Sequence, residues 1–165
     1  MQEYEKFLAE LNRAQVEYVV VGGFAVGLNG FVRMTEDVDI LVEDSRDNLN
    51  RLIHFFENYG EGHAKGLRLE DFTEDEGCIR IIETFPVDIF TKMSGKKLKD
   101  FSSFIAHATI GENSIPYLNA EAMIWLKKGS WREKDLLDVA ELRRLSAKKS
   151  SLCSCIQNFF ARLKK

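Results

Sequence analysis

The pattern of apolar and polar positions in the N-terminal segment predicts a helix, a strand and a second, short helix. Apolar residues recur at intervals of three and four over residues 2–14, which is typical of an amphipathic helix. The run Tyr18–Val21 is aromatic or β-branched throughout and predicts a buried strand. Because Gly22 and Gly23 follow directly, we expect this strand to end in a turn, with a short helix over residues 24–29.

Alternating polar and apolar positions predict further strands. Residues 36–42 alternate as a half-buried strand does, and Ser45 is a suitable N-cap for the helix after it. Residues 61–77 are charged and interrupted by glycine without clear periodicity, so we expect a long loop or a weak edge element. The stretches 78–84 and 86–91 are rich in β-branched and aromatic residues and predict two more strands.

The rest of the chain is predicted to be largely helical. One more strand is expected within residues 103–115, and Asn119 is a suitable cap for a helix over 120–127. Residues 130–133, Ser-Trp-Arg-Glu, have the form of a capping box that opens the next helix. Ser150 is expected to begin a last helix, and the sequence contains no internal repeat.

The composition is that of one globular domain. The chain has 165 residues, 45% of them hydrophobic and 30% charged, so it can bury roughly 70% of its unfolded surface. This apolar content excludes a disordered tail protein. No apolar run reaches the roughly 18 residues of a spanning helix, and the N-terminus lacks the parts of a signal peptide. We therefore expect a cytoplasmic protein with no membrane partner, whose three cysteines are reduced thiols.

The net charge of −3 is divided unevenly along the chain. Residues 1–91 carry 8 basic and 19 acidic side chains, a net of −11, whereas residues 92–165 carry 15 basic and 7 acidic side chains, a net of +8. Such a division fits a metal site beside an anion site, and it fits equally two solvated faces of opposite charge. Composition alone leaves both interpretations open.

A pair of aspartates is the first candidate for chemistry. Asp37 and Asp39 are two residues apart on a predicted strand, so both carboxylates point to one face of the sheet. Their repulsion favours recruitment of a hard divalent cation, Mg²⁺ first. Asp88 lies between Val87 and Ile89 in another predicted strand and converges with the pair if the two strands are neighbours. The alternative is a solvated acidic face at a strand end.

The glycine pair is a candidate phosphate site. Gly22 and Gly23 have no Cβ, so backbone N–H groups there can approach a phosphate at the start of a helix. The sequence contains neither the dinucleotide-binding glycine pattern nor the Walker motif. Arg33 and Thr35, just before the acidic pair, offer a bidentate cation and a hydroxyl. An ordinary tight turn followed by two surface residues is the alternative.

In combination these elements resemble the nucleotidyltransferase superfamily that includes DNA polymerase beta. The elements are Gly22-Gly23, Arg33-x-Thr35, Asp37-Val38-Asp39 and Asp88. The Gly-Gly form, with arginine and threonine before the acids, is similar to the small bacterial branch of lincosamide nucleotidyltransferases and abortive-infection type II toxins. The resemblance implies an α+β fold with a small mixed β-sheet nucleotidyltransferase core over residues 1–118, flanked by helices. A C-terminal helical segment over 119–165 is expected to pack on this core within one compact domain.

The C-terminal half extends the resemblance. Residues 121–127, Glu-Ala-Met-Ile-Trp-Leu-Lys, and the pattern Arg-x-Lys-Asp-x-x-Asp over 132–138 are similar to the helical segment of that branch. Lys127 matches the lysine that is expected to reach the nucleoside triphosphate in this family. The alternative for Lys127 is a solvated helix end that offsets the helix dipole.

The resemblance also implies a reaction. Asp37, Asp39 and Asp88 would hold two Mg²⁺ ions that bridge a nucleoside triphosphate, and Asp88 would assist deprotonation of an acceptor hydroxyl. The nucleoside monophosphate would pass to that hydroxyl, and pyrophosphate would leave. Contacts to the nucleotide are expected from Gly22, Gly23, Arg33, Thr35 and Lys127. The acceptor is left open as a small-molecule hydroxyl, a protein hydroxyl or a tRNA end.

Two other classes of function remain open. A non-catalytic member with the same fold would bind a nucleotide or a partner protein, as one half of a toxin–antitoxin pair does. An RNA-binding protein is suggested by the basic C-terminal half, where lysine pairs bracket the last predicted helix. That helix, with Phe159 and Phe160, is expected to pack on the domain or to pair with a second copy as a homodimer. The presence of all three acids favours the enzyme.

Overall fold

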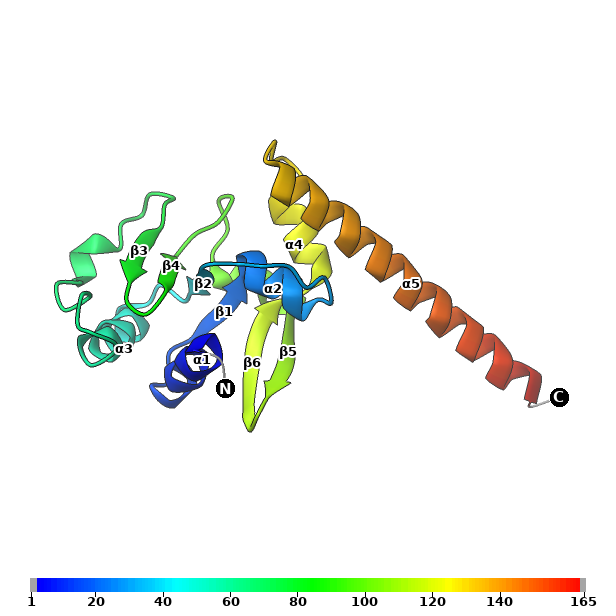
Figure 1. The fold of residues 1–165 in the computed structure, drawn as a ribbon, viewed down its shortest axis with the longest axis horizontal. Coiled ribbons are helices and arrows are strands. Elements are labelled where there is room, and N and C mark those ends of the chain that lie inside the picture. Colours follow the sequence, from blue (N-terminus) through cyan, green and yellow to red (C-terminus); the bar gives the residue numbers. More distant parts are fainter. Residues whose placement is uncertain (1–2, 164–165) are drawn as a thin grey trace.

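The computed structural model describes the backbone of residues 3–163 and the side chains of residues 3–148. The strands are β1 Tyr18–Val21, β2 Val38–Val42, β3 Ile79–Ile82, β4 Pro86–Phe90, β5 Ile105–Ile110 and β6 Asn113–Leu118. The helices are α1 Glu3–Arg13, α2 Gly22–Leu28, α3 Arg46–Glu57, α4 Ala120–Lys127 and α5 Glu133–Leu163, with 3₁₀ helices η1 Leu69–Asp71 and η2 Leu98–Phe104. The strands form one six-stranded mixed sheet, in the order β3-β4-β2-β1-β6-β5, and helices flank it (Figure 1). The α+β expectation is confirmed.

The strand pairing brings two distant segments of the chain side by side. β1 runs antiparallel to β2 and parallel to β6, and β2 runs parallel to β4. The pairs β3/β4 and β5/β6 are antiparallel hairpins. Since β2 and β4 are neighbours, the two strands predicted to carry acidic residues lie next to each other in the sheet.

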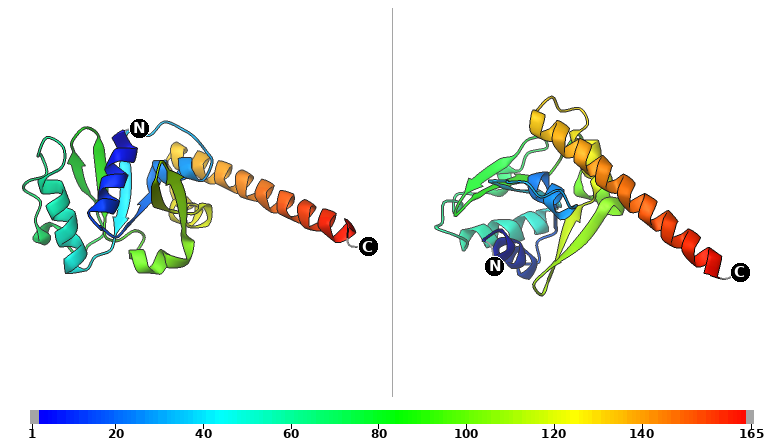
Figure 2. Two further views of the ribbon diagram at one scale, coloured as in Figure 1. Left: turned by 90° about the horizontal axis from the view of Figure 1, so that it is seen from below. Right: turned by 45° about the vertical axis from the view of Figure 1, so that its right-hand side comes forward.

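Aromatic residues hold α1 and α3 together on one face of the sheet (Figure 2). Phe7 of α1 is fully buried, and its ring centroid lies 6.1 Å from that of Phe56 and 5.3 Å from that of Tyr59. The Phe7 ring also lies 5.6 Å from Phe85, just before β4. Because these rings remove a large apolar area from water, they anchor the helices to the part of the sheet that carries the acids.

A buried asparagine joins α3 to the ends of two strands. Asn48 accepts a hydrogen bond of 2.7 Å from the backbone N–H of Glu17. Its amide group donates to the carbonyls of Glu17 and Glu43, at 2.9 and 2.8 Å. Asn48 has no exposed surface, so these partners satisfy it as a buried polar group requires. The contacts hold the start of β1 beside the end of β2.

The predicted caps before α3 and α4 are confirmed, whereas the number of strands after η2 was predicted wrongly. Ser45 accepts a hydrogen bond from the backbone N–H of Asn48, and Asn119 accepts one from that of Ala122. Instead of one strand within 103–115, the chain forms the hairpin of β5 and β6. Gly111 lies in its turn with a φ of +60°, which only glycine adopts readily.

The C-terminal helix differs from the prediction in two respects. α5 begins at Glu133, so Ser130 is not its N-cap, and the Ser130 hydroxyl instead donates to Asp135 at 2.7 Å. A new helix at Ser150 was also wrongly predicted, because α5 continues without a break to Leu163. The first turns of α5 lie against α4, and the remainder extends away from the sheet (Figures 1 and 2). Among the described residues, no helix combines the length and the apolar character needed to span a membrane.

Candidate active site

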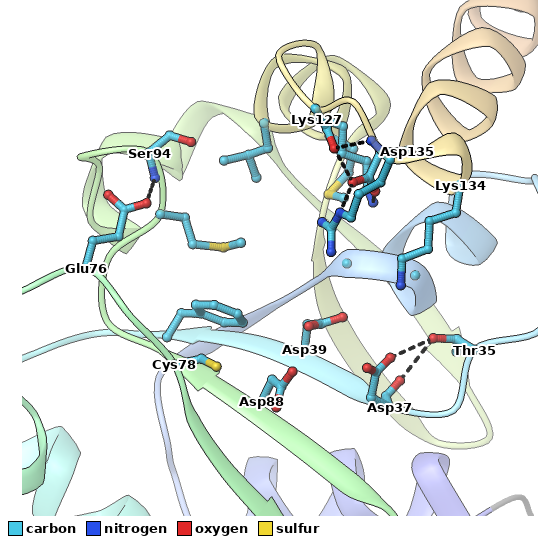
Figure 3. Close-up of a pocket in the computed structure, with 18 of the residues that line it drawn as sticks. Thr35, Asp37, Asp39, Glu76, Cys78, Asp88, Ser94, Lys127, Lys134 and Asp135 are labelled. Atoms are coloured by element: carbon cyan, nitrogen blue, oxygen red, sulfur yellow. Dashed lines mark hydrogen bonds and ion pairs between the residues drawn. The ribbon is translucent and has the colours of Figure 1, made fainter.

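Three carboxylates meet near the middle of the sheet. Asp39 of β2 and Asp88 of β4 are register partners, and Asp37 immediately precedes β2. One carboxylate oxygen from each of the three lies within 4.8 Å of the others (Figure 3). The convergence expected from the sequence is therefore present, and it results from the parallel pairing of β2 with β4.

Burial and like charge act together on Asp39. Its pKa is raised from 3.8 to about 6, first by burial and then by the charges of Asp37 and Asp88. A hydrogen bond from the backbone N–H of Gly23 and the charge of Lys127 oppose this shift of the pKa. A cation that enters the cluster would relieve the repulsion and favour the ionised carboxylate.

The glycine turn lies directly against the acids. Gly22 has a φ of +62°, and a Cβ at this position would lie 1.7 Å from Oδ2 of Asp39. A Cβ on Gly23 would lie 2.6 Å from Oγ1 of Thr35. Glycine is required at Gly22 for both conformation and space, and at Gly23 for space.

The segment before β2 sends alternate side chains toward a cavity. Arg33, Thr35 and Asp37 line it, whereas Val32 and Met34 are 86% and 90% exposed. The hydroxyl of Thr35 donates a hydrogen bond of 3.0 Å to Oδ1 of Asp37 and so restricts the orientation of that carboxylate. The extended backbone of this segment therefore separates the residues predicted for the site from their exposed neighbours.

Two buried aspartates of α5 hold the basic side chains of Arg33 and Lys127 at the cavity. Asp138 accepts hydrogen bonds of 2.7 and 2.9 Å from Arg33 and lies 3.0 Å from Nζ of Lys127. Lys127 also pairs with Asp135, and its side chain is only 11% exposed. Burial alone would raise the pKa of Asp135, but hydrogen bonds from Lys127 and Ser130 outweigh it and lower that pKa. Lys127 therefore lies on the cavity wall with its ammonium group already paired.

Arg80 of β3 was not predicted from the sequence. Its Nε and Nη2 each donate a hydrogen bond of 2.7 Å to an oxygen of Asp88, and Nη2 lies 3.4 Å from Oδ2 of Asp37. The hairpin sets this contact, since Arg80 is the register partner of Asp88. No reliable signal for this contact was present in the sequence: the predicted strands 78–84 and 86–91 leave only Phe85 between them and would pair Ile82 with Asp88, whereas the observed turn spans residues 83–85.

The acids lie at the base of a cavity of about 600 Å³, a size typical of small-molecule sites. Glu76 and Ser94 line one side of it, and Lys127 and Lys134 line another (Figure 3). The carboxylate of Glu76 accepts hydrogen bonds from the backbone N–H groups of Ser94 and Gly95, at 2.6 and 2.8 Å. These bonds join the segment before β3 to the turn after β4.

A comparison with protein families identifies the chain. The model of the aminoglycoside-2''-adenylyltransferase family matches residues 4–142, a segment that includes the glycine turn, the three acids, α4 and the start of α5. The chain belongs to this family. It is a nucleotidyltransferase of the polymerase-beta-like superfamily, and the resemblance found in the sequence is confirmed.

Solved structures share the fold of this family member at low sequence identity. The lincomycin-bound lincosamide antibiotic adenylyltransferase LnuA matches with a TM-score of 0.57 and 17% identity, over 88% of this chain and 98% of that one. The antibiotic-resistance factor ANT(2'')-Ia matches with a TM-score of 0.53 and 16% identity, over 96% and 95% of the two chains. An antigenic nucleotidyltransferase-like protein from Paracoccidioides brasiliensis gives a TM-score of 0.52 and 14% identity, over 97% and 89%. No curated protein matches the chain by sequence.

Proposed function

We propose that the protein transfers a nucleoside monophosphate from a nucleoside triphosphate to an acceptor hydroxyl, with Mg²⁺ bound and pyrophosphate released. The observation that carries this proposal is the meeting of Asp37, Asp39 and Asp88 within 4.8 Å, at the base of a cavity. Family membership supplies the reaction class.

The three acids fit Mg²⁺ as ligands. They offer only carboxylate oxygens, which this ion prefers. The raised pKa of Asp39, about 6, reflects burial and repulsion that a divalent cation would offset. Two bound ions would supply charge neutralisation at the attacking and leaving oxygens of an in-line displacement.

The chain supplies further donors for the triphosphate. Gly22 and Gly23 line the cavity beside Asp39, where a backbone without a Cβ can contact phosphate oxygens. Lys127 has three N–H donors, of which Asp135 and Asp138 accept two, so one remains for a phosphate oxygen. Arg33 and Thr35 line the same cavity and complete the proposed nucleotide contacts.

We place the acceptor on the side of Asp88. Glu76, Cys78 and Ser94 line the cavity there, away from Thr35 and Lys134 (Figure 3). Asp88 would take the proton of the acceptor hydroxyl as the new bond to phosphorus forms. The family name and the lincomycin-bound relative make aminoglycosides and lincosamides the first small-molecule acceptors to test.

The test is pyrophosphate release from each of the four nucleoside triphosphates with a panel of acceptors. The panel contains an aminoglycoside, lincomycin, bulk tRNA and the protein alone. We expect release that requires both Mg²⁺ and one acceptor, and that falls by orders of magnitude in Asp39→Asn. Asp44→Asn is the matched control, because Asp44 pairs with Lys97 outside the cavity. Thermal stabilisation by a nucleotide without release for any acceptor would instead support a non-catalytic binding protein.

A further inference from the structure

Arg80 introduces a permanent positive charge among the three acids. Its guanidinium binds Asp88 through two hydrogen bonds of 2.7 Å, in a fork that matches the carboxylate. The side chain of Asp88 is only 9% exposed, whereas that of Arg80 is 51% exposed. The pair therefore lies at the boundary between the buried sheet and the cavity that Arg80 also lines.

One nitrogen of Arg80 contacts two of the acids. Nη2 lies 2.7 Å from Oδ2 of Asp88 and 3.4 Å from Oδ2 of Asp37. A divalent cation that is shared by these two carboxylates would bind the carboxyl groups that Arg80 contacts, and at such a distance it repels the guanidinium strongly. Arginine cannot lose its proton to avoid this repulsion, so only a movement of the guanidinium relieves it. The cavity beside it provides space for that movement.

We propose that Arg80 is the resident counter-ion of the acidic cluster, and that it competes with the divalent cation for Asp37 and Asp88. In the metal-free protein Arg80 reduces the repulsion between the carboxylates. When the cation binds, the guanidinium releases both carboxylates and turns into the cavity. This inference rests on the metal-dependent function proposed above.

If Arg80 instead positions Asp88 for the metal, the expected change in metal affinity has the opposite sign. A carboxylate oxygen has two lone pairs, so an arginine that stays on Asp88 can orient it as a metal ligand. In that case removal of Arg80 would weaken metal binding, whereas removal of a competitor strengthens it. The direction of the change in affinity therefore separates the two roles.

The experiment measures Mn²⁺ affinity by electron paramagnetic resonance in the wild type, Arg80→Met and Lys134→Met. We expect Arg80→Met to bind Mn²⁺ about tenfold more tightly, because a cation within ion-pair distance of two acids is removed. Lys134 lines the same cavity but forms no ion pair with the three acids, so Lys134→Met is the control for general charge. The affinity of Lys134→Met for Mn²⁺ should increase less than about threefold. Unchanged or weaker binding by Arg80→Met would overturn the proposal.

If Arg80→Met does not fold, NMR of the wild type tests the same displacement of Arg80. The ¹⁵N–¹H resonance of Arg80 Nε reports its hydrogen bond to Asp88. During a Mg²⁺ titration we expect this resonance to shift with the same midpoint as metal binding, and a resonance that does not move would contradict displacement. If neither the wild type nor Arg80→Met binds Mn²⁺, the proposed metal-dependent function fails together with this inference. If the wild type binds Mn²⁺ and Arg80→Met gains nothing, this inference alone fails.

Discussion

Arg33 and Asp138 form a bidentate ion pair although 105 positions separate them in the sequence. Asp138 is fully buried and also lies 3.0 Å from Nζ of Lys127, so one carboxylate joins the segment before β2 to α4 and α5. The same contacts fix two of the cationic residues of the cavity. The acidic segment 1–91 and the basic segment 92–165 therefore contact each other here. The charges are reversed, since Arg33 belongs to the acidic segment and Asp138 to the basic one.

Loss of the Asp138 charge is expected to destabilise the protein. Asp138→Asn leaves Arg33 and Lys127 without their shared anion, and breaking a buried pair in this way costs about 3 to 5 kcal/mol in the free energy of unfolding. Urea denaturation measures the effect. Glu141→Gln is the matched control on the same helix, because its pair with Arg144 is partly exposed, with side chains 26% and 51% exposed, and should contribute less than about 1 kcal/mol. Equal changes in the two variants would contradict a structural role for Asp138.

Gly22→Ala should displace Asp39. The new Cβ would lie 1.7 Å from Oδ2 of Asp39, and the positive φ adds strain. A carboxylate moved by about 1 Å is expected to lower kcat/KM by about a hundredfold. Gly27→Ala is the control within α2, since a methyl group there would meet nothing within 4 Å, and it should leave kcat/KM unchanged. Steady-state kinetics with both variants decides whether the turn holds the acid in place.

The stability of the metal-free protein should depend on pH through Asp39. Its pKa is about 6 in the folded state and 3.8 in the unfolded state, so the folded protein binds the proton more tightly. Protonation of Asp39 therefore adds to the free energy of unfolding below about pH 4, and this contribution is lost as the pH rises through about 6. The loss is about 3 kcal/mol.

Asp39→Asn removes this pH dependence. With a chelator present, denaturation curves of the wild type and Asp39→Asn between pH 4 and pH 7 isolate the contribution of this one carboxyl. We expect the variant to be the more stable protein at pH 7, because burial and repulsion no longer act on a charge. A constant difference between the two proteins across this range would show that Asp39 is not perturbed.

Lys127→Met should affect both nucleotide binding and stability. A lost charge-assisted contact to the triphosphate is expected to raise KM for the nucleotide about tenfold or more, with a smaller change in kcat. Lys128→Met is the control, because Lys128 is exposed and its ammonium lies over the ring of Trp125. If Lys127→Met lowers the melting temperature but leaves KM unchanged, Lys127 only holds Asp135 and Asp138.

Local signals predicted much of the site because the relevant residues are close in sequence. The spacing of Asp37 and Asp39, and the alternation of Arg33, Thr35 and Asp37, follow from the period of an extended chain. Gly22 and Gly23 were recognisable as a glycine turn, which the structure requires at Gly22 for a positive φ and close packing and at Gly23 for close packing alone.

Long-range contacts were beyond local patterns. The fork of Arg80 on Asp88 depends on the register of a hairpin, and the pairing of Lys127 with Asp138 depends on how α4 packs on α5. The continuous α5 was missed because Ser150, a plausible cap, lies inside a longer helix. A capping residue indicates that a helix can begin at that position, but it does not show that the preceding helix has ended.

The most direct test of nucleotidyl transfer compares two positions of the label in the nucleoside triphosphate. With Mg²⁺ and the acceptor that supports pyrophosphate release, label at the α-phosphate should appear in the acceptor and label at the γ-phosphate should leave with pyrophosphate. Asp39→Asn and Asp88→Asn should each reduce transfer of the α-label by orders of magnitude. Transfer of the γ-label to the acceptor, or undiminished transfer of the α-label in both variants, would contradict the account.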